Sequence, residues 1–318
     1  MDVLSDQLAR ARARGAVFSA LRRTAPWGLG FGGRRPLTAH ILLEGSGWLE
    51  AEGRQPAPLA AGDVVLAAEG APYRLVSDLG AAGEAIADAR MRGDDPPGPG
   101  QALILCGAYV VEGSVGEALL GSLPRFVQVP VAQQSARHRE AIELLAREAA
   151  IEGPGQQVLL DRLLDLNLVY ALRAWWHGDE RMAPGWYRGL GHPGLARAIS
   201  AVHERPQHPW TLEEMAHTAA MSRSGFAATF KAVVGRSPAR YLTELRMGRA
   251  EDALLRTDAT VAAIAAQAGY RNEFAFSTAF RRSRGLAPGQ WRAARRGPLA
   301  QGDRVRTQGL SGPPVPAA

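Results

Sequence analysis

The chain of 318 residues contains a single cysteine, Cys106. One cysteine excludes a disulfide within the chain and any zinc site built from several thiolates. No uninterrupted apolar run approaches the ~20 residues that a membrane helix requires. Residues 1–15 carry three arginines with no apolar block after them, unlike a secretory signal. These absences predict a cytoplasmic protein that does not enter a membrane.

Lysine is almost absent as well, since Lys231 is the only one, and the arginines are unevenly placed. Residues 1–194 hold 19 basic and 22 acidic side chains, whereas residues 195–296 hold 16 basic and 8 acidic ones. A basic segment beside a mildly acidic one indicates a polyanion partner for the basic part. The alternative is a basic face that water alone covers.

Residues 17–129 consist of short apolar runs separated by glycine, proline and aspartate, for example 38–43, 62–66 and 102–106. This pattern predicts an all-β barrel or sandwich, with a loop over 92–100. Before it, residues 1–15 fit a short amphipathic helix with Leu4, Leu8 and Ala11 on one face.

Two helices are expected next, over 135–150 and 156–176. The first places Ile142, Leu145 and Ala149 on one stripe. The second has two adjacent apolar stripes, one of Leu159, Leu163, Leu166 and Tyr170, the other of Leu160, Leu164, Leu168, Leu172 and Trp176. So wide an apolar arc indicates a helix that packs on the barrel and on a partner chain. We assign Leu164 and Leu168 to the partner; the alternative is that both stripes are buried within one chain.

The remainder divides into three parts. Residues 178–194 fit a linker with one helical turn, and residues 195–296 are predicted to be helical throughout. Residues 297–318 have no apolar periodicity, which predicts a disordered tail.

The helical part repeats itself. Residues 211–216 recur as 260–265, and after one inserted residue the offset becomes 50. Five further positions then match: Phe226 with Phe276, Phe230 with Phe280, Gly235 with Gly285, Pro238 with Pro288, and Tyr241 with Trp291. Matches at core, turn and cap positions together predict two copies of one structural unit.

Each copy has the pattern of a helix-turn-helix. Thr211 and Glu214 form a capping box for the first helix, and Ser222 caps the second, which Gly235 ends. In the other copy Asn272 is the expected cap of the second helix. Residues 237–238, a cap followed by proline, open a helix that connects the two copies.

Residues 265–270, 276–282 and 285–292 resemble the signature stretch of the AraC/XylS family. The resemblance implies that residues 186–296 form a DNA-binding domain whose two recognition helices enter successive major grooves. It also places base contacts on exposed positions of those helices: Ser224, Ala227, Ala228 and Lys231 on the first, and Glu273, Phe274, Ser277 and Thr278 on the second.

Six arginines near the recognition helices are interpreted as phosphate contacts, with a merely solvated role as the alternative. They are Arg223, Arg236, Arg246, Arg271, Arg281 and Arg282. The first recognition helix departs from the usual family member, because it offers no Arg, Gln or Asn at its base-contact positions. Ala227 and Ala228 could contact thymine methyl groups, or this helix could position the protein more than it specifies sequence.

Residues 1–185 resemble the cupin-type sensor domain that accompanies this family, on 25–29, 40–45, 59–66 and 105–107. The resemblance implies a pocket for a small-molecule effector, which we place at Trp27, His40, Leu42, Tyr73 and Cys106. Enzymatic cupins hold a metal with two histidines and a glutamate. Here His40 and Glu44 are suitably placed, but Leu42 stands at the second histidine position. We therefore expect no metal, no cofactor and no enzymatic activity, and a hydrogen-bonded His40.

Cys106 lies in an apolar run, where a thiol usually packs as a small hydrophobic group. Redox sensing is the alternative, and it requires an exposed thiol with a lowered pKa.

Together these features predict an α+β two-domain chain with a cupin-like β-barrel, flanking helices and an all-α tandem helix-turn-helix. The leading hypothesis is a homodimeric transcription regulator that binds promoter DNA and responds to a small molecule or a redox signal, with RNA polymerase as a further candidate partner. The other hypotheses are a cupin metalloenzyme with a DNA-binding segment and an architectural DNA binder without a ligand.

Overall fold

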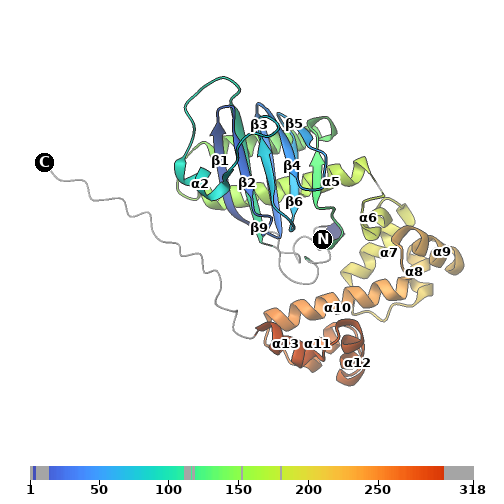
Figure 1. The fold of residues 1–318 in the computed structure, drawn as a ribbon. Coiled ribbons are helices and arrows are strands. Elements are labelled where there is room, and N and C mark those ends of the chain that lie inside the picture. Colours follow the sequence, from blue (N-terminus) through green and yellow to red (C-terminus); the bar gives the residue numbers. More distant parts are fainter. Residues whose placement is uncertain are drawn as a thin grey trace. The chain divides into compact units, whose positions relative to one another are not determined.

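The computed structural model describes residues 3–4, 14–110, 116, 119–151, 153–179 and 181–296. It divides into two compact units, residues 1–248 and 249–318. In the described part of the chain the strands, with α2 among them, precede the long run of helices (Figure 1), so the predicted α+β class is confirmed. The predicted tail at 297–318 and most of the predicted helix at 1–15 lie outside the described residues, and Arg14 and Gly15 belong to the first strand.

The strands are β1 (Arg14–Arg23), β2 (Gly28–Phe31), β3 (Leu37–Glu44), β4 (Ser46–Ala51), β5 (Ala57–Ala60), β6 (Val64–Ala68), β7 (Tyr73–Val76), β8 (Glu84–Ala85), β9 (Ala102–Val110) and β10 (Phe126–Val129). They form two five-stranded sheets, ordered β1-β9-β3-β6-β10 and β5-β4-β7-β2-β8. The strand pairs are antiparallel except β2 with β8. The predicted strands at 38–43, 62–66 and 102–106 correspond to β3, β6 and β9.

The helices are α2 (Ile86–Arg92), α4 (Ala136–Ala149), α5 (Gln156–Gly178), α6 (Gly185–Leu190), α7 (Pro193–Glu204), α8 (Leu212–Thr218), α9 (Arg223–Val234), α10 (Pro238–Arg256), α11 (Val261–Gln267), α12 (Glu273–Arg284) and α13 (Pro288–Arg296), with a short 3-10 helix η1 (Val131–Gln133). The predicted helices at 135–150 and 156–176 are thus confirmed. Helix α2 was not predicted, because it lies in a segment whose sequence pattern indicates strands and loops.

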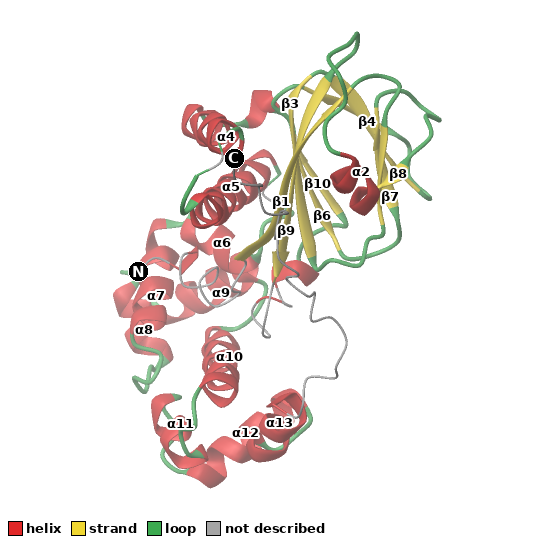
Figure 2. Ribbon diagram, turned by 90° about the vertical axis from the view of Figure 1, so that its left-hand side faces the viewer, coloured by secondary structure: helices red, strands yellow, loops and turns green. Residues whose placement is uncertain are grey.

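Strand alternation gives the first sheet two buried faces, because successive side chains of a strand point to opposite sides. On one side lies the inner core, between the two sheets, which includes Leu29, Leu42, Leu75, Ile104 and Cys106. On the other side lies the outer core, which includes Leu37, Ile41, Leu105, Leu164 and Trp176. Helices α4 and α5 cover this outer face (Figure 2).

Helix α5 buries only one of its two apolar stripes. Leu164 and Leu168 are buried in the outer core, and the Tyr109 hydroxyl donates to the Leu164 carbonyl oxygen at 2.8 Å. Assigning these two leucines to a partner chain was therefore wrong. On the other stripe, Leu159 is 49% exposed and Leu166 is 40% exposed. The alternative that one chain buries both stripes is also wrong for these two residues.

The segment 178–194, predicted to be a linker with one helical turn, contains the short helix α6, which is packed rather than free. The ring centroid of Trp176, near the end of α5, lies 6.0 Å from that of Trp186 and 4.6 Å from that of Tyr187, both on α6. Trp186 packs against the outer core and also against the helical core, which includes Leu195, Ile199, Phe226, Phe230 and Leu242. The sequence pattern did not indicate this packing, because α6 is short, contains two glycines, and is flanked by Pro184 and Gly191. The predicted domain boundary between residues 185 and 186 coincides with the start of α6 and stays a prediction.

Candidate nucleic-acid interface and sensor pocket

The caps predicted for the helical repeat are present. Thr211 and Glu214 form the capping box of α8, and Thr260 accepts from the Ala263 amide at the start of α11. Ser222 accepts from the amide of Gly225 at the start of α9, and Asn272 accepts from that of Ala275 at the start of α12. Each cap satisfies an amide that the first turn leaves unpaired, so the sequence fixes where both second helices begin.

Both copies contain the same aromatic packing. The ring centroids of Phe226 and Phe230 of α9 lie 5.4 Å apart. The ring of Tyr241 of α10 meets that of Phe230 edge-on, with the centroids 5.5 Å apart. In the second copy Phe276 and Phe280 lie 5.6 Å apart, and Trp291 meets Phe280 edge-on at 5.8 Å. The buried rings hold each second helix by one face and leave its other face in solvent.

The residues predicted to contact bases lie on those outer faces. On α9, Ser224, Ala228 and Lys231 are exposed and Ala227 is half-buried. On α12, Glu273, Phe274 and Thr278 are exposed and Ser277 is half-buried. Phe274 is 82% exposed, although a phenyl ring in water is unfavourable unless a partner covers it.

Hydrogen bonding separates the basic side chains into two groups. Several arginines are engaged within the fold: Arg236 and Arg240 with Glu244, Arg284 with Glu251, Arg292 with the Ala259 carbonyl, and Arg296 with Asp258. Five of the basic residues predicted to contact DNA have no partner among the described residues, namely Arg223, Lys231, Arg271, Arg281 and Arg282. Lys231 and Arg281 occupy equivalent positions of the two copies.

Two of the predicted phosphate contacts thus have partners within the protein. Arg246 donates from Nε and Nη2 to the carbonyl oxygens of Pro206 and His208, both at 2.7 Å. It therefore connects α10 to the loop between α7 and α8. Arg236 pairs with Glu244. The sequence could not reveal these partners, since Arg246 and its acceptors are about 40 residues apart.

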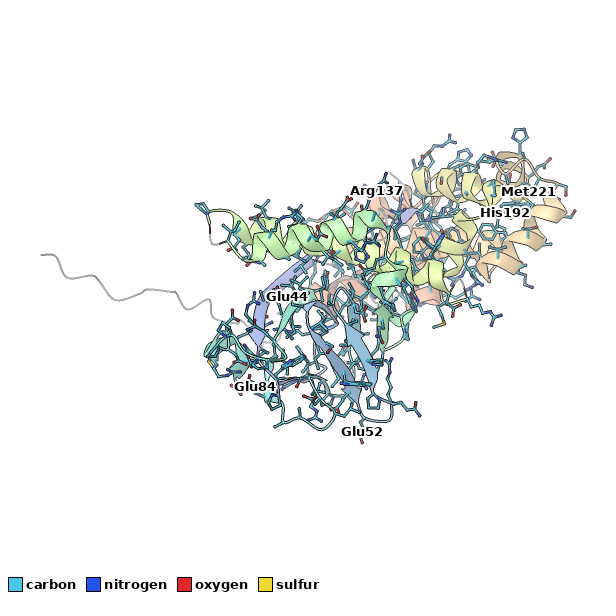
Figure 3. The ribbon with its side chains drawn as sticks, turned by 90° about the horizontal axis from the view of Figure 1, so that it is seen from above. Glu44, Glu52, Glu84, Arg137, His192 and Met221 are labelled. Carbon is cyan, nitrogen blue, oxygen red and sulfur yellow. The ribbon has the colours of Figure 1, made fainter. Side chains whose placement is uncertain are left out.

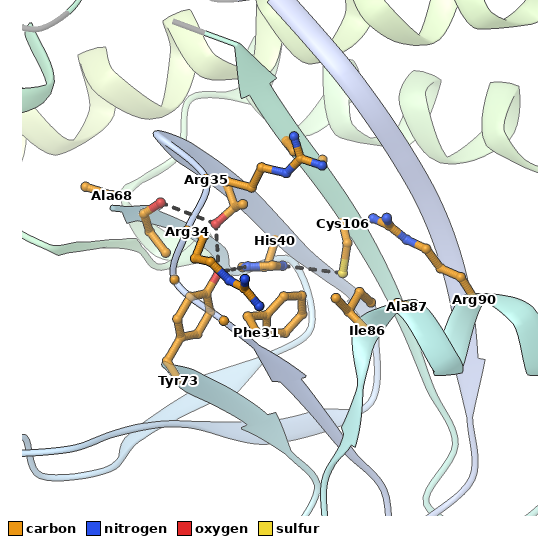
Figure 4. Close-up of a pocket in the computed structure, with 16 residues that line it drawn as sticks. Phe31, Arg34, Arg35, His40, Ala68, Tyr73, Ile86, Ala87, Arg90 and Cys106 are labelled. Atoms are coloured by element: carbon orange, nitrogen blue, oxygen red, sulfur yellow. Dashed lines mark hydrogen bonds between the residues drawn. The ribbon is translucent and has the colours of Figure 1, made fainter. Parts of the chain in front are cut away.

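Three of the five predicted effector residues line one cavity of about 260 Å³ between the sheets. His40 of β3 lies opposite Cys106 of β9 in the sheet register, and its Nδ1 is 3.3 Å from the Cys106 Sγ. Its Nε2 is 2.7 Å from the Tyr73 hydroxyl, which is 2.7 Å from the Thr38 hydroxyl (Figure 4). A continuous hydrogen-bonded row, with His40 at its centre, therefore forms one wall of this cavity.

Trp27 and Leu42, the other two predicted effector residues, do not line this cavity. They belong to the inner core and border a void of about 10 Å³ together with His40 and Asp63. So small a void holds one water at most.

The basic side of the cavity was not predicted from the sequence. Arg34 and Arg35 follow β2, and Arg90 lies on α2; together with Phe31 and Ile86 they complete its lining. No pattern marks these arginines as a group, because α2 brings Arg90 beside residues more than fifty positions away.

Burial determines the protonation of the cavity wall. Burial, with a smaller contribution from the Arg90 charge, lowers the pKa of His40 to about 3. Burial also raises the pKa of the Cys106 thiol to about 12. Both groups are therefore neutral near pH 7.

Neither of the two candidate metal ligands is free to hold an ion. Glu44 lies at the end of β3 (Figure 3). Its Oε2 pairs with Nη1 of Arg22 at 2.9 Å. His40 uses both ring nitrogens in the hydrogen-bonded row. Among the described residues no group of three His, Cys, Asp or Glu side chains is placed to hold a metal. In the same part of the chain, none of the helices combines the length and the apolar character that crossing a membrane requires.

Known proteins resemble both parts of the chain. A family model described as a cupin matches residues 2–177, and one described as a helix-turn-helix domain matches residues 215–294. A protein of Streptomyces antibioticus named as an AraC-like transcription regulator is 32% identical over 301 residues, covering 92% of this chain and 98% of that protein. The RCS-specific HTH-type transcriptional activator RclR of Escherichia coli is 29% identical over 297 residues, covering 92% of this chain and 97% of that protein.

Among solved structures, the DNA-binding domain of AdpA in complex with a target DNA is 31% identical, with a TM-score of 0.33, and covers 35% of this chain and 98% of that chain. The two family models match the N-terminal and the C-terminal part of the chain, and each of the two relatives covers 92% of it. The chain therefore belongs to the AraC-type transcription regulators, as a DNA-binding protein rather than an enzyme, with an N-terminal cupin domain and a C-terminal helix-turn-helix region.

Proposed function

We propose that this regulator recognises specific promoter sequences through α9 and α12, and that a small molecule bound in the cupin domain controls it. The observation that carries the DNA proposal is the set of five basic side chains on or beside these helices that have no partner in the described fold. Side chains that the fold does not use are available to phosphates, whose neutralisation supplies much of the affinity for DNA.

Within the interface the two helices have different roles. Thr278 and Ser277 can exchange hydrogen bonds with base edges, and the exposed Phe274 can cover a thymine methyl group. On α9 the outer positions offer Ala227, Ala228 and Ser224, which provide little hydrogen bonding to bases. We therefore assign sequence preference mainly to α12, and positioning on the backbone to Arg223, Lys231, Arg271, Arg281 and Arg282.

The test is selection of bound duplexes from a random library by the full chain, followed by affinity measurements at several salt concentrations. We expect an enriched site bound at least about a thousandfold more tightly than random duplex. An architectural DNA binder would enrich no sequence, and that result would remove the proposed specificity.

Substitutions separate positioning from base contact. Arg281→Ala should weaken binding about equally on all sequences and lower the salt slope by roughly one unit, because one phosphate contact is lost. Thr278→Ala should instead change the preferred bases. Arg54→Ala, at an exposed arginine of the cupin domain outside α4 and α5, is the charge-matched control and should do neither. A loss confined to the selected site in Arg281→Ala would contradict the positioning role.

For the signal we favour a bound small molecule over oxidation of Cys106. The thiol is 2% exposed and burial raises its pKa to about 12, whereas a reactive cysteine needs access and a thiolate. The cavity beside it has room for a ligand and several polar groups that could orient one.

We further propose that the regulator is a homodimer joined through the exposed stripe of α5. Three further apolar side chains of this part of the chain are exposed: Leu144 of α4, Ile151 between α4 and α5, and Val158 of α5. Contact with RNA polymerase and a cytoplasmic location, where the protein would meet DNA, stay predictions.

A further inference from the structure

The arginines of the cupin domain differ in whether a carboxylate neutralises them. Arg22 pairs with Glu44, Arg74 with Glu50, and Arg92 with both Glu84 and Asp95. Arg34, Arg35 and Arg90 have no carboxylate partner among the described residues, and all three line the cavity beside His40 (Figure 4). Among the residues that the structure describes, no acidic side chain lines that cavity. Within this part of the chain, three positive charges are thus gathered without a counter-charge.

Arg90 is the innermost of the three. It is half-buried on α2, and only its Nε has a described acceptor, the Ser19 hydroxyl at 3.0 Å. Burial, and to a smaller extent the charge of Arg35, lowers the pKa of Arg90. Like charges held together in a partly desolvated place are unfavourable until an anion joins them. The terminal nitrogens of Arg90 remain available for the paired hydrogen bonds that a carboxylate accepts.

The rest of the cavity suits an apolar body. Phe31 stacks on Tyr73 with ring centroids 5.0 Å apart, and Ile86, Ala67 and Ala108 add aliphatic surface. A volume of about 260 Å³ lies just below the usual range for ligand pockets. The cavity therefore suits a small molecule.

We propose that this pocket takes a small organic carboxylate, with its charged group on Arg90, Arg34 and Arg35 and its apolar part against Phe31 and Ile86. This inference rests on the proposed sensor function and names the chemical class of its ligand. His40 and Tyr73, held neutral by burial, provide hydrogen bonds at the floor without repelling an anion.

The experiment measures binding of four anions to the full chain without DNA, by equilibrium dialysis at neutral pH and 0.15 M salt. The probes are hexanoate and 3-phenylpropionate, each compared with its primary amide, together with acetate and inorganic phosphate. We expect at least one of the two larger acids to bind about tenfold or more tightly than its amide, and more tightly than acetate or phosphate. Binding of neither larger acid at millimolar concentration, equal binding of acid and amide, or preference for phosphate would each overturn the proposal.

Variants locate the site. Arg90→Gln and the double variant Arg34→Gln/Arg35→Gln should each weaken acid binding about tenfold and leave amide binding unchanged. Arg34 and Arg35 are exposed, so the double variant tests the proposal even where Arg90→Gln does not fold. Arg54→Gln, an exposed arginine of the same domain outside the cavity, is the matched control. Unchanged acid binding in the double variant would contradict the site.

The two proposals fail separately. Acid binding that leaves the affinity for the selected DNA unchanged would keep the ligand class and remove its role as a signal. Absence of acid binding together with sequence-specific DNA binding would keep the regulator and remove the carboxylate.

Discussion

His40 shows how one buried side chain combines structural and binding roles. It is 2% exposed, its two ring nitrogens meet Tyr73 and Cys106, and it faces the cavity from β3. Because an imidazolium cannot be hydrated there, burial keeps the ring neutral. The same burial makes folding sensitive to pH.

The pKa of His40 in the folded protein, about 3, lies below the ordinary histidine value of 6.5, so below pH 6.5 the unfolded chain binds the proton more readily. Stability should therefore fall as pH drops from 6.5 towards 3. Between pH 7 and pH 5 the His40 contribution amounts to about 2 kcal/mol. Urea unfolding at pH 7 and at pH 5 gives the free energy of unfolding at each pH. The difference between the two values should be about 2 kcal/mol smaller for His40→Asn than for the wild type. For His217→Asn, at an exposed position, it should equal the wild-type difference. An unchanged difference in His40→Asn would mean that other groups cause the acid sensitivity.

Ala220 has a backbone conformation that disfavours its side chain. Its φ is 55°, and it forms the turn between α8 and α9, where the second copy has Gly269 with φ 77°. A residue with a Cβ in this region destabilises the folded state by roughly 1–2 kcal/mol. Glycine removes this strain, but its greater conformational freedom in the unfolded chain offsets part of the gain in stability.

We expect Ala220→Gly to raise the free energy of unfolding by about 0.5–1 kcal/mol, and Gly269→Ala to lower it by a similar amount. Ala232→Gly, the same change within α9, should lower it by about 1 kcal/mol. Denaturant unfolding of the three variants is the measurement. Destabilisation by Ala220→Gly as large as that by Ala232→Gly would show that the turn carries no strain.

At the scale of single residues, caps and aromatic contacts were predictable because they depend on neighbours a few positions away or on the repeat. The pairing of arginines was not, since Arg246 and Arg90 acquire their surroundings from segments far along the chain. Trp27 and Leu42 were misplaced for a related reason: alternation puts them inside the barrel, but only the packing decides which interior residues border a cavity.

Among the elements, α5 leaves part of its apolar surface uncovered in a single chain. Its period correctly predicted two apolar stripes, but periodicity could not tell which stripe meets the sheet. The contacts of Leu164 with the outer core decide this. Leu159, Leu166 and Val158 remain in solvent, where covering each apolar Å² would contribute ~25 cal/mol.

We therefore expect wild type to sediment as a dimer at micromolar concentration, and Leu159→Asp or Leu166→Asp to give folded monomers, since a buried carboxylate without a partner is unfavourable. Leu164→Asp is the contrasting variant and should unfold the cupin domain, because that side chain is 1% exposed. A wild type that stays monomeric, or a Leu159→Asp variant that stays dimeric, would place the dimer contact elsewhere or remove it.

At the scale of the molecule, the sequence predicted the order of the parts, the strands of the sandwich and the doubled helical unit, all confirmed. What it missed are the short elements between longer ones. Helix α2 spans seven residues among glycines and aspartates, and Arg23, fully buried, holds it through the carbonyl oxygens of Ala89 and Gly93. Such a helix exists through tertiary contacts more than through its own pattern.

The position of Trp186 in two cores has a consequence for how the protein absorbs heat on unfolding. A side chain shared by the outer and helical cores cannot lose one environment without disturbing the other. Scanning calorimetry should therefore show the sandwich and the first helix-turn-helix melting in one endotherm, with a van't Hoff enthalpy close to the calorimetric value, and a smaller endotherm for residues 249–296. Trp186→Ala should split the main endotherm in two. Trp210 packs against the helical core and is not among the described side chains that pack against the outer core, so Trp210→Ala should leave the main endotherm single.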